Sequence, residues 1–310
     1  MQFTTIGAAV VDIVVSPVRP LLSAKQDVDH IGLYAGGGAV NAALNAVALG
    51  AHVTVHACVG SDLEGGLLRA LLQRYNIRPM MPEHELPTGK AVVMVDAQGA
   101  ARAYAQRGAS TWVGEHGFAG LAQADVVYVT GLSLESQAWL IQALGQLADA
   151  PARLVITPGA RQLAQPGALE PLWLLADLLC VNAHEAAALC GDVLADGEVV
   201  TPEQARTLAA RLLRREGQAV LLTLGRQGAL YFDGREACFH AALPVEVVST
   251  IGAGDAHASA FVHAWAGGAS PATALEQAAQ SAARVIQVIP ANLAGHLRPA
   301  VGLRAPASPP

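Results

Sequence analysis

Several common patterns are missing from this sequence. Its four cysteines are widely spaced and form no CxxC pair, so neither a disulfide scaffold nor a zinc site is indicated. It contains no GxxxxGK[ST] segment, which excludes phosphate binding of the P-loop type. The first apolar segment is not followed by GxGxxG, so a dinucleotide-binding oxidoreductase is a poor alternative.

Long apolar runs and an excess of basic residues are also missing. Hydrophobic residues make up 53% of the 310 residues, yet no uninterrupted run reaches the roughly 18 residues of a membrane span. The formal net charge of -6 argues against DNA or RNA as a partner, because binding them needs a basic face. No basic region precedes the first apolar stretch, so we expect no signal peptide and a cytoplasmic location.

What the chain does contain is an alternation of strand and helix patterns. Apolar segments typical of strands are followed by helical patterns, such as residues 39–49, which end at Gly50. The predicted strands are residues 3–10, 52–59, 126–129, 154–156, 178–181 and 220–222. This rhythm predicts an α/β fold with a doubly wound, mostly parallel sheet, helices on both faces and ligands beyond the C-terminal strand ends.

Two segments do not follow this rhythm. Residues 91–95 and 101–106 flank a loop that contains Gly99, which predicts a β-hairpin. Residues 13–34 are short, interrupted by proline and extended in character. From the residues alone, an edge decoration of the main sheet is an alternative for the hairpin.

A loop of small residues followed by an acid is the most informative feature. It consists of Gly252, Ala253, Gly254 and Asp255. The alternation of apolar residues over 243–248 predicts a half-buried strand before it, and a helical pattern from Ala256 follows and stops at Gly267. At such a strand-to-helix turn, unpaired amides and the helix dipole converge on an anion. A tight turn that needs glycine only for its φ angles is the alternative.

The acid at the end of this loop suits a general base. Asp255 can accept a proton from a substrate hydroxyl while the amides neutralise charge on a transferring phosphoryl group. A positioned base contributes roughly 10²–10⁴-fold to a rate. The alternative is that Asp255 only caps or favours the first helical turn.

The ordered set of motifs resembles the ribokinase-like (PfkB) carbohydrate and nucleoside kinases. Their C-terminal signature, D-T-x-G-A-G-D, matches residues 249–255 except at the first position, and their glycine pair followed by a helix with an Asn matches residues 36–43. Further matches in family order are residues 59–62 with Gly65, residues 182–185 and residues 223–228. The resemblance runs from residue 6 to about residue 288.

For the acceptor, the resemblance implies sugar contacts from Asp12, Gly36, Gly37 and Asn41. Asp12 is a charge in the apolar run 6–15, which is costly to bury without hydrogen-bond partners, and sugar hydroxyls are such partners. The two glycines let the backbone approach a ring closely. From the residues alone, the alternatives are an Asp bonded to local amides and an Asn turned to solvent.

For the nucleotide, the resemblance implies contacts from Asn182, Glu185, Thr223, Gly225 and Gly228. In the family, the Asn and the Glu face the triphosphate of ATP and its hydrated Mg²⁺, which agrees with the tendency of Mg²⁺ to keep several waters. By themselves, Asn182 and Glu185 also form the pattern of a capping box. The other three residues equally suit a plain hairpin turn.

The resemblance also implies a small β-lid over the sugar site, where it would exclude water. The implied division assigns residues 1–11, 36–88 and 111–300 to the α/β core, residues 12–35 and 89–110 to the lid, and residues 301–310 to a disordered tail. An exposed edge of the lid favours pairing into a homodimer.

The function implied is ATP-dependent, Mg²⁺-assisted phosphorylation of a hydroxyl of a small sugar, with Asp255 as the base. A nucleoside or pseudouridine kinase of the same fold is one alternative, and a non-catalytic sugar-binding or regulatory protein is another. Ser249 stands where the family usually has an Asp that helps to hold a monovalent cation. The sequence therefore leaves a dependence on K⁺ open.

Overall fold

A computed structural model describes residues 1–18, 27–114, 118, 120–147, 153–195, 197–288 and 292–293 of the protein. The predicted tail, residues 301–310, lies outside this part of the chain. All statements below concern the described residues.

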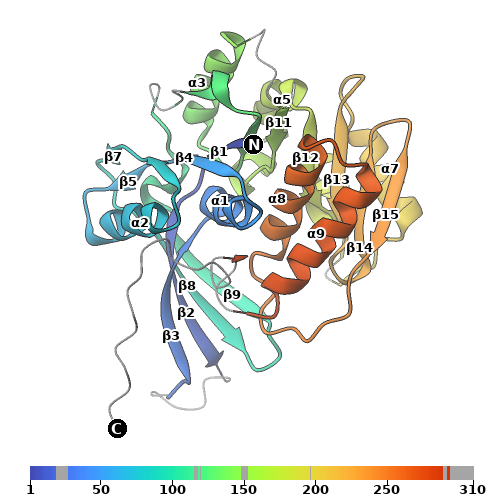
Figure 1. Cartoon of the computed structure of the whole chain (residues 1–310). Coiled ribbons are helices and arrows are strands. Elements are labelled where there is room, and N and C mark those ends of the chain that lie inside the picture. Colours follow the sequence, from blue (N-terminus) through green and yellow to red (C-terminus); the bar gives the residue numbers. More distant parts are fainter. Residues whose placement is uncertain are drawn as a thin grey trace.

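A nine-stranded sheet forms the body of the molecule, in the order β15-β14-β13-β12-β11-β10-β1-β4-β6 (Figure 1). Neighbouring strands from β13 to β6 are parallel, and β14 and β15 are antiparallel additions at one edge. The strands are β1 (Gln2–Ile6), β4 (His52–His56), β6 (Arg78–Met80), β10 (Val126–Val129), β11 (Arg153–Ile156), β12 (Leu178–Asn182), β13 (Ala219–Thr223), β14 (Gly228–Phe232) and β15 (Ala237–Ala241). The predicted doubly wound, mostly parallel sheet is confirmed.

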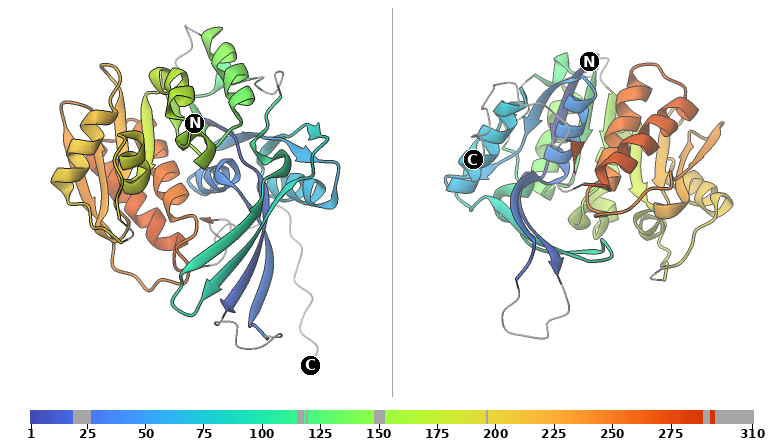
Figure 2. Two further views of the ribbon diagram at one scale, coloured as in Figure 1. Left: turned by 180° about the vertical axis from the view of Figure 1, so that it is seen from behind. Right: turned by 60° about the horizontal axis from the view of Figure 1, so that its bottom comes forward.

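Helices cover both faces of this sheet, as the views from the two sides show (Figure 2). One face carries α1 (Gly38–Ala48), α2 (Leu63–Arg74), α8 (Ala253–Ala266) and α9 (Pro271–Val285). The other carries α3 (Leu134–Gly145), α5 (Pro166–Leu175), α6 (Ala183–Leu189) and α7 (Pro202–Leu212). Shorter elements are α4 (Ala160–Leu163), β5 (Val59–Gly60), β7 (Glu83–His84), η1 (Gly108–Thr111), η2 (Leu121–Gln123) and η3 (Gly225–Gln227).

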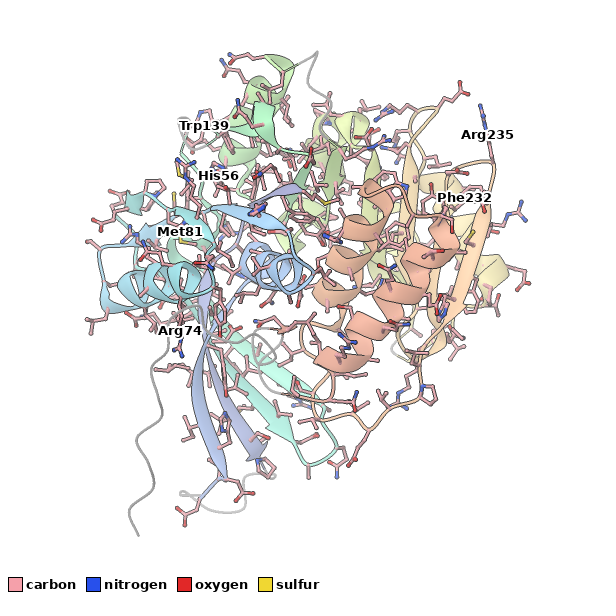
Figure 3. The ribbon with its side chains drawn as sticks, viewed as in Figure 1. His56, Arg74, Met81, Trp139, Phe232 and Arg235 are labelled. Atoms are coloured by element: carbon pink, nitrogen blue, oxygen red, sulfur yellow. The ribbon has the colours of Figure 1, made fainter. Side chains whose placement is uncertain are left out.

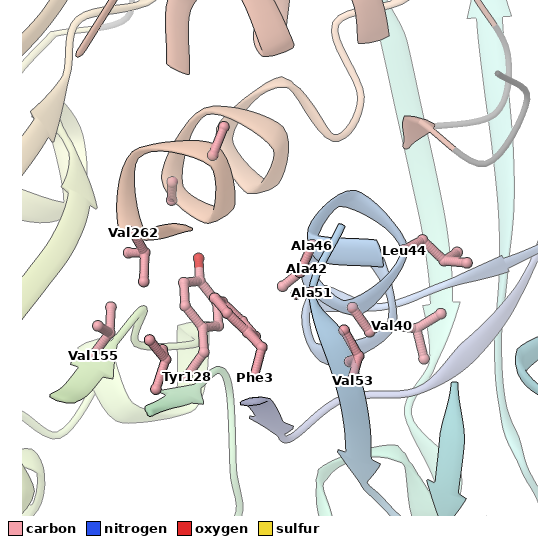
Figure 4. Close-up of a cluster of buried hydrophobic side chains, with 14 of the residues drawn as sticks. Phe3, Val40, Ala42, Leu44, Ala46, Ala51, Val53, Tyr128, Val155 and Val262 are labelled. Carbon is pink, nitrogen blue, oxygen red and sulfur yellow. The ribbon is translucent and has the colours of Figure 1, made fainter. Parts of the chain in front are cut away.

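Successive residues of the central strands supply two separate hydrophobic cores. In β10, Tyr128 lies in the core under α1, α8 and α9, whereas Val127 and Val129 lie in the core under α3, α5 and α7. Figure 4 shows Phe3 and Tyr128 of the sheet below Val262 of α8. Side chains alternate across a strand, so a strand covered on both faces is apolar at most of its positions. This requirement explains the unbroken apolar runs in the sequence.

At the β14–β15 edge of the sheet the side chains divide by polarity. Phe232 ends β14 inside the second core, whereas Arg235 in the following turn points away from the body (Figure 3). Arg235 pairs with the exposed Glu216. Charge near a sheet edge disfavours pairing with another chain.

A second sheet of four strands projects from the body (Figure 1). This lid sheet has the order β3-β2-β8-β9 and consists of β2 (Val10–Val18), β3 (His30–Gly36), β8 (Gly89–Asp96) and β9 (Ala101–Gln106). The antiparallel pairing of β8 with β9 confirms the predicted hairpin. Its inner face carries Val14, Val93 and Val95, against which Ile251 packs. The inner face of the lid sheet therefore lies against the loop that precedes α8.

One predicted strand is wrong. Residues 243–248 form an extended loop without strand pairing, and Leu243, Val247 and Val248 are 38%, 40% and 41% exposed. Pro244 has no N–H to donate to a ladder, and β15 already ends the sheet at this edge. The loop instead reaches the tip of the β8–β9 hairpin, where a Cβ on Gly99 would lie 3.0 Å from the carbonyl oxygen of Val248.

The four cysteines are all free. Cys58 and Cys180 are buried, whereas Cys190 and Cys238 are partly exposed. None of the helices in the described ranges is long and apolar enough to cross a membrane.

Candidate active site

The loop of small residues opens α8, although a loop and not a strand leads into it. Gly252 is the N-cap of α8, with a left-handed φ of 73° that a glycine adopts without strain. The backbone N–H groups of Gly254 and Asp255 have no hydrogen-bond partner among the described residues. A Cβ on Gly254 would point into open space. The start of α8 therefore offers free amides, at the positive end of the helix dipole, to an approaching anion.

Asp255 is held from the side by α1. Asn41 Nδ2 donates a hydrogen bond of 2.9 Å to Asp255 Oδ2, and no amide of its own first turn donates to the carboxylate among the described residues. The pKa of Asp255 is raised to about 6, chiefly by burial and in small part by the Glu185 carboxylate, while the bond from Asn41 opposes the rise. A half-buried carboxylate with a raised pKa and a free Oδ1 is suited to accept a proton.

Asp12 faces the same site from the lid sheet. Burial and, to a smaller extent, the charge of Asp255 together raise the pKa of Asp12 to about 6, so the two carboxylates lie within electrostatic reach of each other. A Cβ on Gly36 would lie 1.9 Å from Asp12 Oδ2, so the carboxylate occupies the space that this glycine leaves. No described residue donates a hydrogen bond to Asp12.

Gly37 and Asn41 shape the start of α1. Gly37 is the N-cap, with a φ of 90°, and a Cβ there would lie 2.5 Å from the carbonyl oxygen of Ala8. Both glycines of the predicted sugar site thus have packing reasons for lacking a side chain. Their approach to a sugar ring stays a prediction.

Asn182 and Glu185 form a complete capping box at the start of α6. Glu185 N donates to Asn182 Oδ1 and Asn182 N donates to Glu185 Oε2, each at 2.9 Å. Burial raises the pKa of Glu185, while its hydrogen bonds with Asn182 oppose the rise. The Glu185 carboxylate also contributes to the raised pKa of Asp255, so the two acids lie within electrostatic reach of each other. Oε1 of Glu185 remains available to a ligand.

The remaining predicted nucleotide contacts lie at the turn from β13 to β14. Thr223 pairs in register with Asn182, so the two lie side by side at the C-terminal strand ends. Gly225 has a φ of 58° beside open space, and Gly228 has a φ of 121°, with a Cβ position 2.0 Å from the carbonyl oxygen of His240. The turn is a hairpin connection, as the alternative interpretation had it, and nucleotide binding there stays a prediction.

Two side chains at the site were not found by the sequence analysis. Asn292 is buried and donates to Asn41 Oδ1 at 3.2 Å. No pattern around Asn292 would have shown this contact. Tyr34 of β3 lies directly opposite Asp12 of β2, and its hydroxyl is 2.8 Å from His30 Nε2. The sequence does contain a signal for Tyr34 and its partner His30. The period-two alternation of β3 puts both residues on the inner face of the lid sheet.

Cation sites made by the protein alone are not evident. In the described ranges, no group of three or more His, Cys, Asp and Glu residues could hold a metal ion. Ser249 is buried, and its hydroxyl accepts a hydrogen bond of 3.3 Å from Ile251 N. The serine hydroxyl is therefore already engaged in a hydrogen bond with the backbone of the loop.

Comparison with known proteins gives a consistent result. Residues 3–294 match the family described as pfkB family carbohydrate kinase, which confirms the resemblance. The 1-phosphofructokinase of Haloferax volcanii is 42% identical over 108 residues, covering 34% of this chain and 33% of that protein. The ribokinase of Haemophilus influenzae is 26% identical over 237 residues, covering 74% and 73%. The first curated relatives are thus matched over about a third of their length.

Solved structures share the whole fold. A ribokinase from Cryptococcus neoformans in complex with ADP has a TM-score of 0.75 at 22% identity, with 94% of each chain covered. The phosphofructokinase-2 of Escherichia coli in complex with potassium gives the same three values. A ribokinase from Thermotoga maritima has a TM-score of 0.73 at 21% identity, with 93% of this chain and 94% of that chain covered. At these identities the likeness establishes the fold.

Proposed function

Because the chain belongs to the pfkB family of carbohydrate kinases, we propose that it transfers the γ-phosphoryl group of ATP to a hydroxyl of a small sugar. One observation carries the proposal. Asp255 lies among free amides at the start of α8, is held by Asn41, and shares its site with the carboxylate of Asp12. A base, an anion-binding helix start and an acceptor-binding acid are the parts that such a transfer needs.

In the proposed mechanism, Asp12 accepts hydrogen bonds from two hydroxyls of the acceptor and so fixes its orientation. The attacking hydroxyl gives its proton to Oδ1 of Asp255 as its oxygen bonds to the γ-phosphorus. The bond from that phosphorus to the bridging oxygen of ADP breaks, and ADP leaves. The amides of Gly254 and Asp255, which have no partner among the described residues, stabilise the negative charge on the transferring group, where each preorganised donor contributes on the order of 10²–10³-fold.

We place the nucleotide along the strand ends from Asn182 to Thr223, which lie side by side. Glu185 has one carboxylate oxygen outside its capping box, and one such oxygen suits a Mg²⁺ ion that keeps most of its waters and binds mainly to the phosphates. The described residues fit that mode because they offer no closed cage of ligands. A Mg²⁺ ion bound there would offset the negative charge of the ATP phosphates.

A nucleoside acceptor is a second candidate, favoured by the inner face of the lid sheet. Tyr34 and His30 meet above Gly32, with their ring centroids 6.0 Å apart, next to Asp12 in the adjacent strand. A half-buried tyrosine ring beside a hydroxyl-binding acid offers stacking to a planar base attached to a ribose.

The outer face of the lid sheet supports the proposed homodimer. Ile13, Leu33, Val92 and Tyr104 are aligned in register across its four strands. Leu33 and Tyr104 are 60% and 63% exposed, which is unusual for aligned apolar residues on one sheet face. A second copy would cover this face, so Leu33→Asp should turn a dimer into a monomer in sedimentation while folding is retained.

An ADP-release screen over pentoses, hexoses, sugar acids and nucleosides, with and without K⁺, tests the proposal. We expect ADP release with at least one neutral sugar or nucleoside, and none in the absence of Mg²⁺. Binding of a sugar without any ADP release would favour the non-catalytic alternative. The comparison of ADP release with and without K⁺ decides whether a protein with Ser249 at this position is activated by the cation. A cytoplasmic location stays a prediction.

A further inference from the structure

The hydrogen bonds around Asn41 give its side-chain amide a defined direction. Asn41 Nδ2 donates to Asp255 Oδ2 at 2.9 Å, and Asn41 Oδ1 accepts from Asn292 Nδ2 at 3.2 Å. The two ends of an amide differ chemically, because the nitrogen only donates and the oxygen only accepts. A flipped Asn41 would bring its oxygen against the carboxylate oxygen and its nitrogen against the nitrogen of Asn292. Both contacts would be repulsive.

A backbone carbonyl sets the direction of the whole chain of bonds. Asn292 Nδ2 also donates to the carbonyl oxygen of Ala35 at 3.4 Å. A carbonyl can only accept, so the NH₂ end of Asn292 must face Ala35 and, with it, Asn41. Leu293 N donates to Asn45 Oδ1 at 2.9 Å and ties the same segment to α1. Asn292 is only 1% exposed, so bulk water does not compete for its hydrogen bonds.

We propose that Asn292 is a positioning residue that keeps the NH₂ end of Asn41 directed at Asp255. The inference rests on the proposed function, because it assigns Asn292 the task of keeping the base ionised and its Oδ1 free for the acceptor hydroxyl. If Asn41 turned its oxygen to Asp255, the contact would favour the protonated acid, which can donate to that oxygen. A protonated Asp255 cannot take a proton from the acceptor.

Other groups also act on Asp255, and a substitution at Asn292 leaves them in place. Among the described residues, the titratable groups within electrostatic reach of Asp255 are Asp12 on β2, Glu185 on α6 and Tyr128 on β10. Burial and Glu185 raise the pKa of Asp255, and the bond from Asn41 lowers it. A change in the titration of Asp255 on substitution of Asn292 therefore reports on the Asn41 bond.

The test compares pH profiles of kcat/KM for Asn292→Leu, which keeps the approximate volume but cannot donate, and Asn45→Ala. The second variant is the matched control, because it removes the bond from Leu293 N to the Asn45 side chain and leaves the Asn292–Asn41–Asp255 bonds intact. We expect the pKa of Asp255 to rise by about one unit in Asn292→Leu, which gives a tenfold loss of kcat/KM at acidic pH that largely recovers at alkaline pH. Asn45→Ala should keep the limb of the unmodified protein. An unmoved limb in Asn292→Leu, or an equal movement in both variants, would overturn the proposal.

A measurement on the unmodified protein covers the case in which Asn292→Leu does not fold. With ¹⁵N-labelled asparagine, the side-chain NH₂ signal of Asn41, assigned by its loss in Asn41→Ser, should shift with pH as Asp255 titrates. A flipped amide would place this NH₂ away from the carboxylate, and its signal would not follow that titration. The latter result would refute the proposed direction of the bonds.

Failure of this inference can be told apart from failure of the proposed function. If Asp255→Asn abolishes ADP release while the Asn292 profile is unchanged, the kinase assignment stands and the positioning role is wrong. If Asp255→Asn is as active as the unmodified protein, the proposed function itself is wrong.

Discussion

The two ends of the candidate active site hold their acids in different ways. Glu185 has a structural task of its own, because it closes the capping box of α6 with Asn182. Asp12 and Asp255 have none: no described residue donates to Asp12, and Asp255 is bonded only from the side by Asn41. Burial raises the pKa of all three acids.

This difference separates residues that the fold needs from residues that a ligand needs. Burying a carboxylate without sufficient partners costs free energy, and at Glu185 the cap offsets part of that cost. At Asp12 and Asp255 nothing in the described fold offsets it fully. Substrate hydroxyl groups and a transferred proton would offset that cost. Asp12 and Asp255 therefore carry the functional assignment.

The largest expected effect comes from removing the base. Asp255→Asn keeps the size of the side chain but accepts a proton poorly, so we expect kcat to fall roughly 10²–10⁴-fold. Steady-state kinetics with the best acceptor, together with acceptor binding by calorimetry, measure the two properties separately. Binding should be nearly unchanged. A parallel loss of acceptor affinity would instead make Asp255 a binding residue like Asp12.

Asp12→Asn should affect mainly the acceptor. It replaces a charged acceptor of two hydroxyl hydrogen bonds by a neutral amide, and bonds to charged groups contribute about 1.5–3 kcal/mol each. We expect the KM of the acceptor to rise roughly 10²-fold, with a smaller fall in kcat and no change in the KM of ATP. A change confined to the KM of ATP would show that Asp12 contacts ATP and not the acceptor.

The activity should fall steeply on the acidic side of about pH 6, where Asp12 and Asp255 both become protonated. Because both carboxylates must be ionised, the limb should approach a hundredfold per pH unit, against tenfold for one group. The profile of kcat/KM checks the slope. A limb near pH 4 would show that neither pKa is raised.

Glu185 provides the smallest effects and the sharpest contrast. Glu185→Gln keeps a side-chain oxygen for the capping box, so we expect little loss of stability and a raised Mg²⁺ requirement. Glu185→Ala should lose both the capping box and the oxygen proposed for Mg²⁺. Its free energy of unfolding should fall by about 0.5–2 kcal/mol, as for other cap deletions. Thermal unfolding and Mg²⁺ titration of the two variants measure these properties. Equal stability of both variants would mean that the capping box contributes nothing.

The regular elements could be predicted because their physics is local. All residues of β10, Val126–Val129, are buried in one of the two cores, because helices cover both sides of the strand. The sequence shows this burial as an unbroken apolar run. The loop over residues 243–248 has the alternation of a strand, but whether a strand forms depends on a neighbour to pair with, which a local pattern does not contain.

The candidate site divides in the same way. The start of α8 and the position of Asp255 follow from a contiguous motif, and Asp12 was indicated by a charge in an apolar run. Asn292 meets Asn41 across 251 positions of the chain. Only the packed fold brings these two amides together, so no spacing rule applied to the sequence would have found the contact.

The central claim is that Asp12 and Asp255 face each other in one site, and the titration of Asp12 tests it most directly. Carboxyl ¹³C chemical shifts of Asp12 can be followed with pH in the unmodified protein and in Asp255→Asn. Since the charge of Asp255 contributes to the raised pKa of Asp12, we predict a lower pKa for Asp12 in the variant. The same pKa in both proteins would contradict a shared site.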